Sequence, residues 1–354
     1  MTAMRHGYLT LLLAAAPLGA QTLEQRIGAV RDGTVRLTYA ARAGLCGDGK
    51  ETVQSGPVIV VFPSMFGYGR SDMNVCFTGP VRVAIGRSEG ETVSLRVHVG
   101  GRWNDAGGDK DLGVVSAPEA ARYFLGEAAR AGRQNAEYAL GAAVFADSVE
   151  LWPDLAQLAR SGDVRASTRQ RAVSWIGTYD EPGAVRVLHD LANDSSLDEE
   201  VRGGAIIALG REDISDDEVA WLRRLYPTLS PKLRDDVFLA VSRSDSPAAA
   251  TWLAQVAASE VESEHTRQQA LFWLGQGHAP TVDLVRLYDK LHGAQIRTHY
   301  TFVLSQRHDR EALDKLIDVA EHDADRDVRK QALFWLGQSR DPRAVQYLRE
   351  LVIR

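Results

Sequence analysis

The chain has 354 residues, of which 45% are hydrophobic and 25% are charged, and this composition is that of a folded protein rather than a disordered one. Its formal net charge is −6, so it lacks the basic excess that neutralises phosphate groups. We therefore expect no nucleic-acid partner.

The first twenty residues have the pattern of a secretory signal. Arg5 and His6 precede an apolar run from Leu9 to Leu18, and small residues follow it. The run is too short to span a bilayer comfortably. The pattern predicts a signal peptide over residues 1–20 and an exported protein, periplasmic or secreted, that is not embedded in a membrane once the signal is removed. A retained anchor or a misassigned start codon is the alternative.

A small β-rich domain is predicted over residues 21–115. Apolar and polar residues alternate in Val81–Ile85 and again in Val93–Val99, with a polar, glycine-containing turn between them, which predicts a β-hairpin. Two further strands are predicted at Thr34–Ala41 and Pro57–Ser64, and a short helix precedes them.

The only two cysteines, Cys46 and Cys76, fall within this domain. An even number of cysteines in an exported chain predicts a disulfide. Two buried free thiols are the alternative. The chain has no CxxC motif, so the cysteines have neither the spacing of a zinc site nor that of a thioredoxin-like redox pair.

The segment Asp105–Gly113 places three aspartates among glycines and is a weak candidate for a calcium loop. It lacks ligands at alternate positions and the final glutamate of such loops. We therefore expect an acidic linker here.

Helical repeats are predicted over residues 116–354. The octamer QALFWLGQ occurs at Gln269–Gln276 and at Gln331–Gln338, and related segments recur every 30 to 36 residues. Each segment opens with an arginine, from which positions are counted below as +1, +2 and onward. These arginines are Arg133, Arg169, Arg202, Arg234, Arg267, Arg297 and Arg329. A near-constant period of this length predicts a solenoid.

Each segment has the pattern of a buried helix. Positions +3, +4 and +7 form one apolar side, and position +8 is glycine or serine, where we expect the helix to end. The large residues at +5 and +6, such as Phe272 and Trp273, are predicted to pack in the core between repeats. A peptide- or cofactor-binding stripe is the alternative for them.

A second helix follows each segment. Proline stands where a first helical turn tolerates it, at Pro182, Pro247, Pro280 and Pro342. Every repeat is therefore predicted to be a helical hairpin. The opening arginines would form a ladder along the stack and bond acidic groups or helix-end carbonyls of the neighbouring repeat.

The stretch DADRDVRKQALFWLGQSRDPRAVQYLREL resembles the short bacterial HEAT repeat, also called the phycocyanobilin-lyase-like type, and the resemblance covers residues 117–354. It implies a mainly α fold, a right-handed α-solenoid of about seven helical hairpins, here preceded by the β-rich domain. Tyr300 and Thr301 depart from the repeat pattern, and the N-terminal domain resembles no family equally firmly.

The sequence predicts no catalytic, cofactor-binding or metal-binding residue. Six histidines lie between His265 and His322, but none forms the i, i+4 pair of a zinc helix, so we expect solvated surface histidines. The serine-elbow, phosphate-loop, dinucleotide and metalloprotease motifs are absent.

We therefore expect an exported, non-catalytic scaffold that binds a protein or peptide along the solenoid and needs no cofactor. The resemblance implies the same, because arrays of this type mostly bind proteins and a minority handle tetrapyrroles. The alternative is an envelope enzyme or ligand carrier whose site lies in or next to the β-rich domain.

Overall fold

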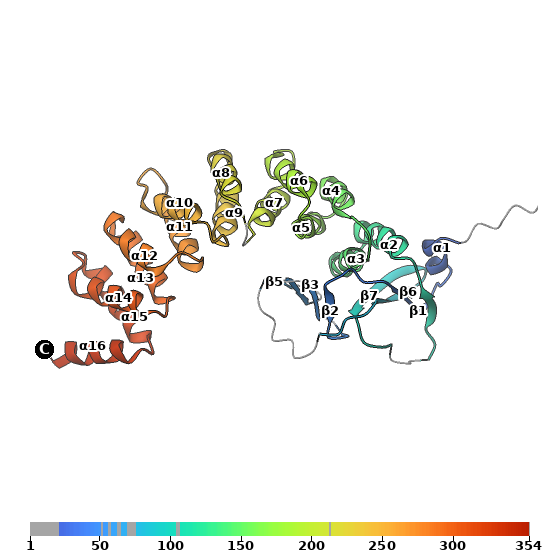
Figure 1. Cartoon of the computed structure of the whole chain (residues 1–354), viewed down its shortest axis with the longest axis horizontal. Helices are drawn as coiled ribbons and strands as arrows, with labels where there is room; N and C mark the ends of the chain where they lie inside the picture. Colours follow the sequence, from blue (N-terminus) through green and yellow to red (C-terminus); the bar gives the residue numbers. More distant parts are fainter. Residues whose placement is uncertain are drawn as a thin grey trace, which may run out of the picture. The chain divides into compact units, whose positions relative to one another are not determined.

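The computed structural model describes residues 21–50, 52–55, 58–61, 65–68, 76–103, 107–211 and 214–353 (Figure 1). The predicted signal peptide lies outside these residues. The chain divides into two compact units, Met1–Val149 and Glu150–Arg354. Within the described ranges, none of the helices has the length and apolar character needed to cross a membrane.

The N-terminal unit is built around a mixed four-stranded sheet. The helix α1 (Leu23–Gly28) precedes the strands β1 (Gly33–Tyr39), β6 (Val81–Ser88), β7 (Glu91–Val99) and β8 (Lys110–Val114), and the strand order is β7-β6-β1-β8. Strands β6 and β7 pair antiparallel, which confirms the predicted hairpin. Strand β8 pairs parallel with β1. Alternate residues such as Val83 and Val97 are fully buried, as the period-two pattern requires.

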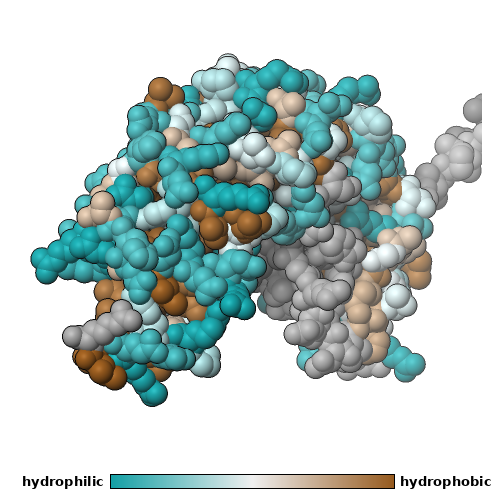
Figure 2. Space-filling view, turned by 60° about the vertical axis from the view of Figure 1, so that its left-hand side comes forward, coloured by the Kyte–Doolittle hydropathy of each residue, from teal (hydrophilic) through white to brown (hydrophobic). Residues whose placement is uncertain are grey.

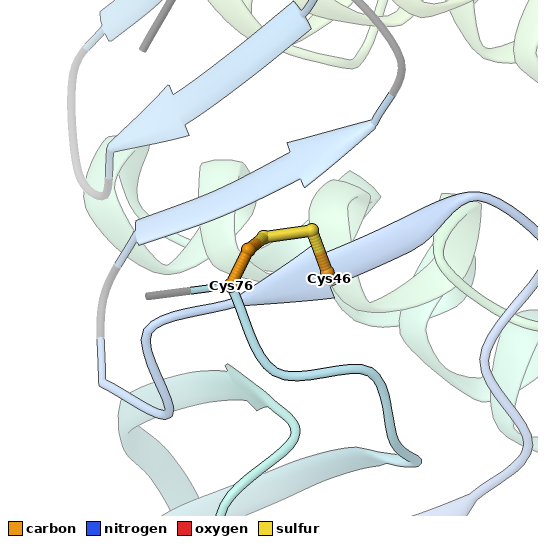
Figure 3. Close-up of a disulfide and its surroundings, with 2 residues drawn as sticks. All are labelled: Cys46 and Cys76. Atoms are coloured by element: carbon orange, nitrogen blue, oxygen red, sulfur yellow. A yellow bond between two sulfur atoms is a disulfide. The ribbon is translucent and has the colours of Figure 1, made fainter. Parts of the chain in front are cut away.

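A second sheet is antiparallel throughout and follows chain order. Its strands are β2 (Leu45–Gly47), β3 (Thr52–Ser55), β4 (Val58–Val61) and β5 (Met65–Tyr68). A disulfide joins Cys46, in β2, to Cys76, with the two Cα atoms 5.3 Å apart (Figure 3). Beside it, Gly47 and Phe77 exchange two backbone hydrogen bonds of 3.0 and 2.8 Å. Both ends of the segment that carries β3, β4 and β5 are therefore held together.

The helices α2 (Ala117–Arg130) and α3 (Arg133–Val144) belong to the N-terminal unit. The Tyr39 hydroxyl donates a buried hydrogen bond of 2.5 Å to the Ala142 carbonyl, and the Tyr39 ring lies 6.2 Å from that of Phe124. The division between units thus falls after Val149, whereas the sequence pattern placed the start of the array at residue 116. The first predicted repeat helix, α3, packs with the sheet, because it contacts β7 and its Ala142 carbonyl accepts the Tyr39 hydrogen bond.

The C-terminal unit is an array of helices in two layers (Figure 1). We call the layer that contains the repeat arginines the inner layer, because its helices lie on the inner side of this unit's curve. The inner helices are α5 (Ala166–Ile176), α7 (Glu199–Leu209), α9 (Pro231–Ser242), α11 (Glu264–Gln276), α13 (Ala294–Ser305) and α15 (Arg326–Gln338). The outer helices are α4 (Trp152–Arg160), α6 (Pro182–Asn193), α8 (Asp216–Leu225), α10 (Pro247–Ala258), α12 (Thr281–Leu287), α14 (Arg310–His322) and α16 (Pro342–Ile353). The 3-10 turns η1 (Tyr226–Thr228) and η2 (Tyr288–Lys290) extend α8 and α12. The predicted succession of helical hairpins is confirmed.

The inner helices end at or next to the glycine at position +8, as predicted: Gly177 and Gly210 are the C-caps of α5 and α7, and α11 ends one residue after Gly275. None of Gly177, Gly210 and Gly275 has a positive φ, so these glycines are not left-handed helix caps. A Cβ atom at Gly177 would lie 2.8 Å from the Cβ of Ala208, and one at Gly275 would collide with Val303. Gly337, in the last inner helix, has nothing within 4 Å of such an atom. The glycines therefore allow the next inner helix to approach closely.

Candidate binding surface

The repeat arginines connect consecutive repeats. On one side they reach the end of the preceding outer helix: Arg202 and Arg267 each donate a 3.1 Å hydrogen bond, to the carbonyls of Ala192 and Ala257 respectively. Arg234 bonds the Pro227 carbonyl at 3.2 Å, and Arg329 bonds that of Asp323 at 2.5 Å. A cation at a helix C-terminus is favoured by the helix dipole.

On the other side, these arginines reach the loop that leads into the next inner helix. Arg267 donates to the His292 carbonyl at 2.9 Å, and Arg297 pairs with the buried Asp323 carboxylate at 2.8 Å. Arg169 pairs with Asp198 at the start of α7. The side chain of Arg133 lies outside the described structure. The described arginines are thus committed to holding the stack together.

The histidines of the C-terminal unit do not gather at one point. His278 contacts Asp245 at 2.5 Å, His322 contacts Asp318 at 3.0 Å, and His265 lies 3.5 Å from Asp235. Within the described ranges, no group of three or more His, Cys, Asp or Glu residues is placed to hold a metal ion.

Position +5 of the inner helices forms a row that faces solvent. All six of its members are half-buried or exposed, and they are apolar after the first: Ser174, Ile207, Leu239, Phe272, Phe302 and Phe334. Phe334 retains 52% exposure. The prediction that the residues at +5 pack in the core is therefore wrong for Phe334, whereas the other members of the row are partly buried. The inner helices bury +3 and +7 against the array, which leaves +5 on the opposite side.

The last three residues of this row, Phe272, Phe302 and Phe334, form one aromatic patch with Trp335, which stands at position +6 of α15. The ring of Phe302 lies 6.5 Å from Phe272 and 5.4 Å from Trp335, and Trp335 lies 4.9 Å from Phe334. The patch thus crosses α11, α13 and α15. The face of this unit that Figure 2 brings forward is mostly hydrophilic, with separate hydrophobic groups among the polar residues.

A hollow of about 520 Å³ opens at the N-terminal ends of the same three helices. Its walls include Glu264 and Gln268 of α11, Thr298 and His299 of α13, and Asp325 and Asp327 at the start of α15. His299 joins the hollow to the aromatic patch, because its ring lies 5.7 Å from that of Phe302. Burial lowers the pKa of His299, which keeps the imidazole neutral at pH 7.

The carboxylate of Asp236, in α9, is half-buried and lies close to Gly203 of α7. A side chain at Gly203 would collide with the Asp236 carboxylate, so glycine leaves room for it. Burial raises the pKa of Asp236 to about 6, while the nearby Lys232 opposes the shift. Folding therefore favours the protonated carboxyl.

Replacing Asp236 by asparagine is expected to stabilise the protein by about 1–2 kcal/mol above pH 6, after allowance for partial solvent exposure. The folded pKa is raised, so the stability that Asp236 contributes is present below pH 4 and is lost as pH rises to 6. Urea unfolding at pH 4 and pH 7.5 measures the difference. Asp217→Asn, at an exposed position of α8, is the control and should change neither value. Equal effects at both pH values would contradict this assignment.

The N-terminal unit contains a cluster in which two arginines flank a tryptophan. The guanidinium carbons of Arg36 and Arg82 lie 5.1 and 5.0 Å from the centre of the Trp103 ring. Arg82 is 5% exposed and donates to the carbonyls of Gly100 at 2.8 Å and Gly49 at 3.1 Å. These contacts tie the loop after β2 to the main sheet.

The segment expected to be an acidic linker is partly a strand. Asp109 forms an ion pair with Arg36, and the residues that follow it form β8. The Asp111 carboxylate accepts a 2.7 Å hydrogen bond from the backbone N–H of Gly113. Asp105 lies outside the described residues. The acidic side chains seen here therefore support the local backbone.

Comparisons with known proteins identify the repeats. A family model described as HEAT repeats matches residues 152–228 and 292–354. No curated protein matches the sequence. Human deoxyhypusine hydroxylase in complex with glycerol is similar in structure, with 17% identity and a TM-score of 0.32 over 66% of this chain and 90% of that one. An engineered protein has the same identity and TM-score over 67% of this chain and 68% of its own. At this identity and TM-score, the two similar structures say nothing about the activity of this chain. The C-terminal array therefore contains HEAT repeats at residues 152–228 and 292–354.

Proposed function

We propose that the chain is an exported, non-catalytic scaffold whose C-terminal array binds a protein or peptide along the solvent face of its inner helices. The +5 row carries this proposal. A row of apolar side chains on successive helices offers one contact per repeat, which suits an extended partner. Large apolar side chains that stay partly exposed in neighbouring repeats, with Phe334 the most exposed of this row, are typical of an interaction surface.

Export is supported by two independent features. The apolar run before Gln21 has the length and charged start of a signal peptide. The Cys46–Cys76 disulfide suits an oxidising compartment.

A photo-crosslinking experiment tests the binding surface. A photoreactive benzoylphenylalanine at Phe334, on α15, is expected to form a covalent adduct with the partner in an envelope extract of the native organism. The same group at Val282, on the outer helix α12, should form none, although the two positions are similarly exposed at 52% and 44%. The matched exposure separates a specific partner from random collisions.

Adducts from Val282 as readily as from Phe334 would overturn the proposal. It would also be overturned by adducts confined to Val93, which is 57% exposed on β7. That result would move the function to the N-terminal unit, as would substrate turnover abolished by one acidic or histidine substitution.

A further inference from the structure

We infer that the hollow at α13 receives a lysine or arginine side chain of the bound peptide, while an apolar residue of the same peptide packs on the aromatic patch. This inference rests on the proposed function and specifies the chemistry of the partner. It is carried by the shape of the hollow, by its charge and by its continuity with the patch.

Two small residues begin α13 beside the hollow. Its N-cap is Gly293, with φ +105°, and the next residue is Ala294. The corresponding pair is Ser263–Glu264 in α11 and Asp325–Arg326 in α15. The N-cap and first residue of α13 are therefore small, whereas the first residues of α11 and α15 are long, and Gln295 of α13 also lines the hollow. The volume of about 520 Å³ lies within the range of about 300–1,000 Å³ that is usual for ligand pockets.

The charge of the lining favours a cation. The described lining residues include the carboxylates of Glu264, Asp325 and Asp327 but no lysine or arginine. Two cations lie close to these acids from their own helices: Arg267 is 3.5 Å from Glu264, and Lys330 is 3.1 Å from Asp327. Neither fills the hollow.

The Arg267 side chain is buried and donates to the Ala257 and His292 carbonyls, so it is committed to the arginine ladder. The Asp325 carboxylate caps α15 by accepting the backbone N–H groups of Asp327 and Val328. The Glu264 carboxylate also accepts a 3.1 Å hydrogen bond from the Gln268 amide. Three carboxylates around one opening still leave oxygen lone pairs for an incoming ammonium or guanidinium group.

The hollow and the aromatic patch share a wall, because His299 lines the first and contacts Phe302 of the second. An extended peptide rises about 3.3 Å per residue. Its cationic and apolar residues are therefore expected within about three positions of one another. Charge pairing would orient the peptide, and the patch would bury its apolar side chain.

Selection of random dodecapeptides displayed on phage, with the full chain as target, tests the inference. Enriched peptides are expected to carry lysine or arginine within three positions of an aromatic or large aliphatic residue. The best peptide, synthesised with a fluorescein label, gives a Kd by anisotropy at fixed ionic strength. The double variant Glu264→Gln/Asp327→Asn should weaken its binding about tenfold, because charge-assisted hydrogen bonds are removed.

A matched control is the double variant Asp283→Asn/Glu311→Gln. These acids occupy the first turns of the outer helices α12 and α14, as Glu264 and Asp327 occupy those of α11 and α15. The control variant Asp283→Asn/Glu311→Gln should change the Kd of the peptide less than twofold. Replacing the cation of the peptide by alanine should weaken binding to the native chain but cause no further loss in the Glu264→Gln/Asp327→Asn variant.

The two proposals fail differently. Peptides without a cation that lose affinity with Phe334→Ala would overturn the cationic pocket and leave the scaffold standing. Peptides unaffected by Phe334→Ala and by the acidic double variant would overturn both. A selection that enriches no sequence would count against both as well.

Discussion

Replacing both Cys46 and Cys76 by alanine is expected to lower the free energy of unfolding of the N-terminal unit by about 3–4 kcal/mol. The disulfide spans 30 residues of sequence, and its loss restores conformational freedom to that loop in the unfolded chain. Hydrogen exchange of the full chain in increasing urea measures the effect in peptides from β3 and β4. Peptides from α9 and α11 should be unchanged, because they lie in the other unit.

A reducing agent supplies the control for this variant. Dithiothreitol should lower the stability of the native protein to that of the double variant and should not affect the double variant further. Unreduced native protein should contain no alkylatable thiol. Two free thiols, or unchanged protection of β3 and β4 in the variant, would show that the bridge does not stabilise this sheet.

The helical array could be predicted from the sequence because its signal is local and repeated. Each inner helix contains its own arginine, its own apolar face and its own glycine, so the same pattern appears several times. The start of the C-terminal unit could not be predicted in this way. The helical period continues through α2 and α3, and it is contacts with residues far away in sequence, such as Tyr39 and Thr92, that show these helices to pack in the first unit.

Strand β8 was missed for a related reason. The segment Asp105–Gly113 is rich in glycine and aspartate, which is typical of loops. It becomes a strand by pairing with β1, more than seventy residues earlier in the chain. Amino-acid composition indicates only the local preference of a segment for loop or strand. Pairing with a strand that is distant in sequence overrides this preference.

The exposure of the +5 row had a signal in the sequence. At about 100° per residue, position +5 lies roughly 150° from the centre of the face formed by +3, +4 and +7. Phenylalanine at that position is therefore directed away from the core, although its hydrophobicity alone suggested burial. The hollow had no comparable signal, because it depends on acids of α11 and α15 that meet only across α13.

Replacing Phe238 by alanine is expected to destabilise the C-terminal unit by about 3–5 kcal/mol. Phe238 of α9 is fully buried, and its ring lies 5.4 Å from that of Tyr226 and 5.8 Å from that of Trp252. These three rings join α8, α9 and α10, so the cavity opens where two successive repeats meet. Because each repeat depends on its neighbours, hydrogen exchange should increase first in these helices and then in the adjacent ones.

Phe334→Ala removes the same side chain as Phe238→Ala but from an exposed position. Comparing the two stability losses therefore separates the effect of burial from that of residue type. Phe334 stands at the solvent-facing +5 position of α15, so its removal creates no enclosed cavity and should cost less than about 1 kcal/mol. Urea unfolding of the two variants side by side measures the contrast. Similar losses of stability in both variants would mean that the +5 row is part of the core and would argue against its use as a binding surface. A large loss for Phe238 with a small loss for Phe334 means that the array does not need the aromatic patch for folding, which leaves these residues available to a partner.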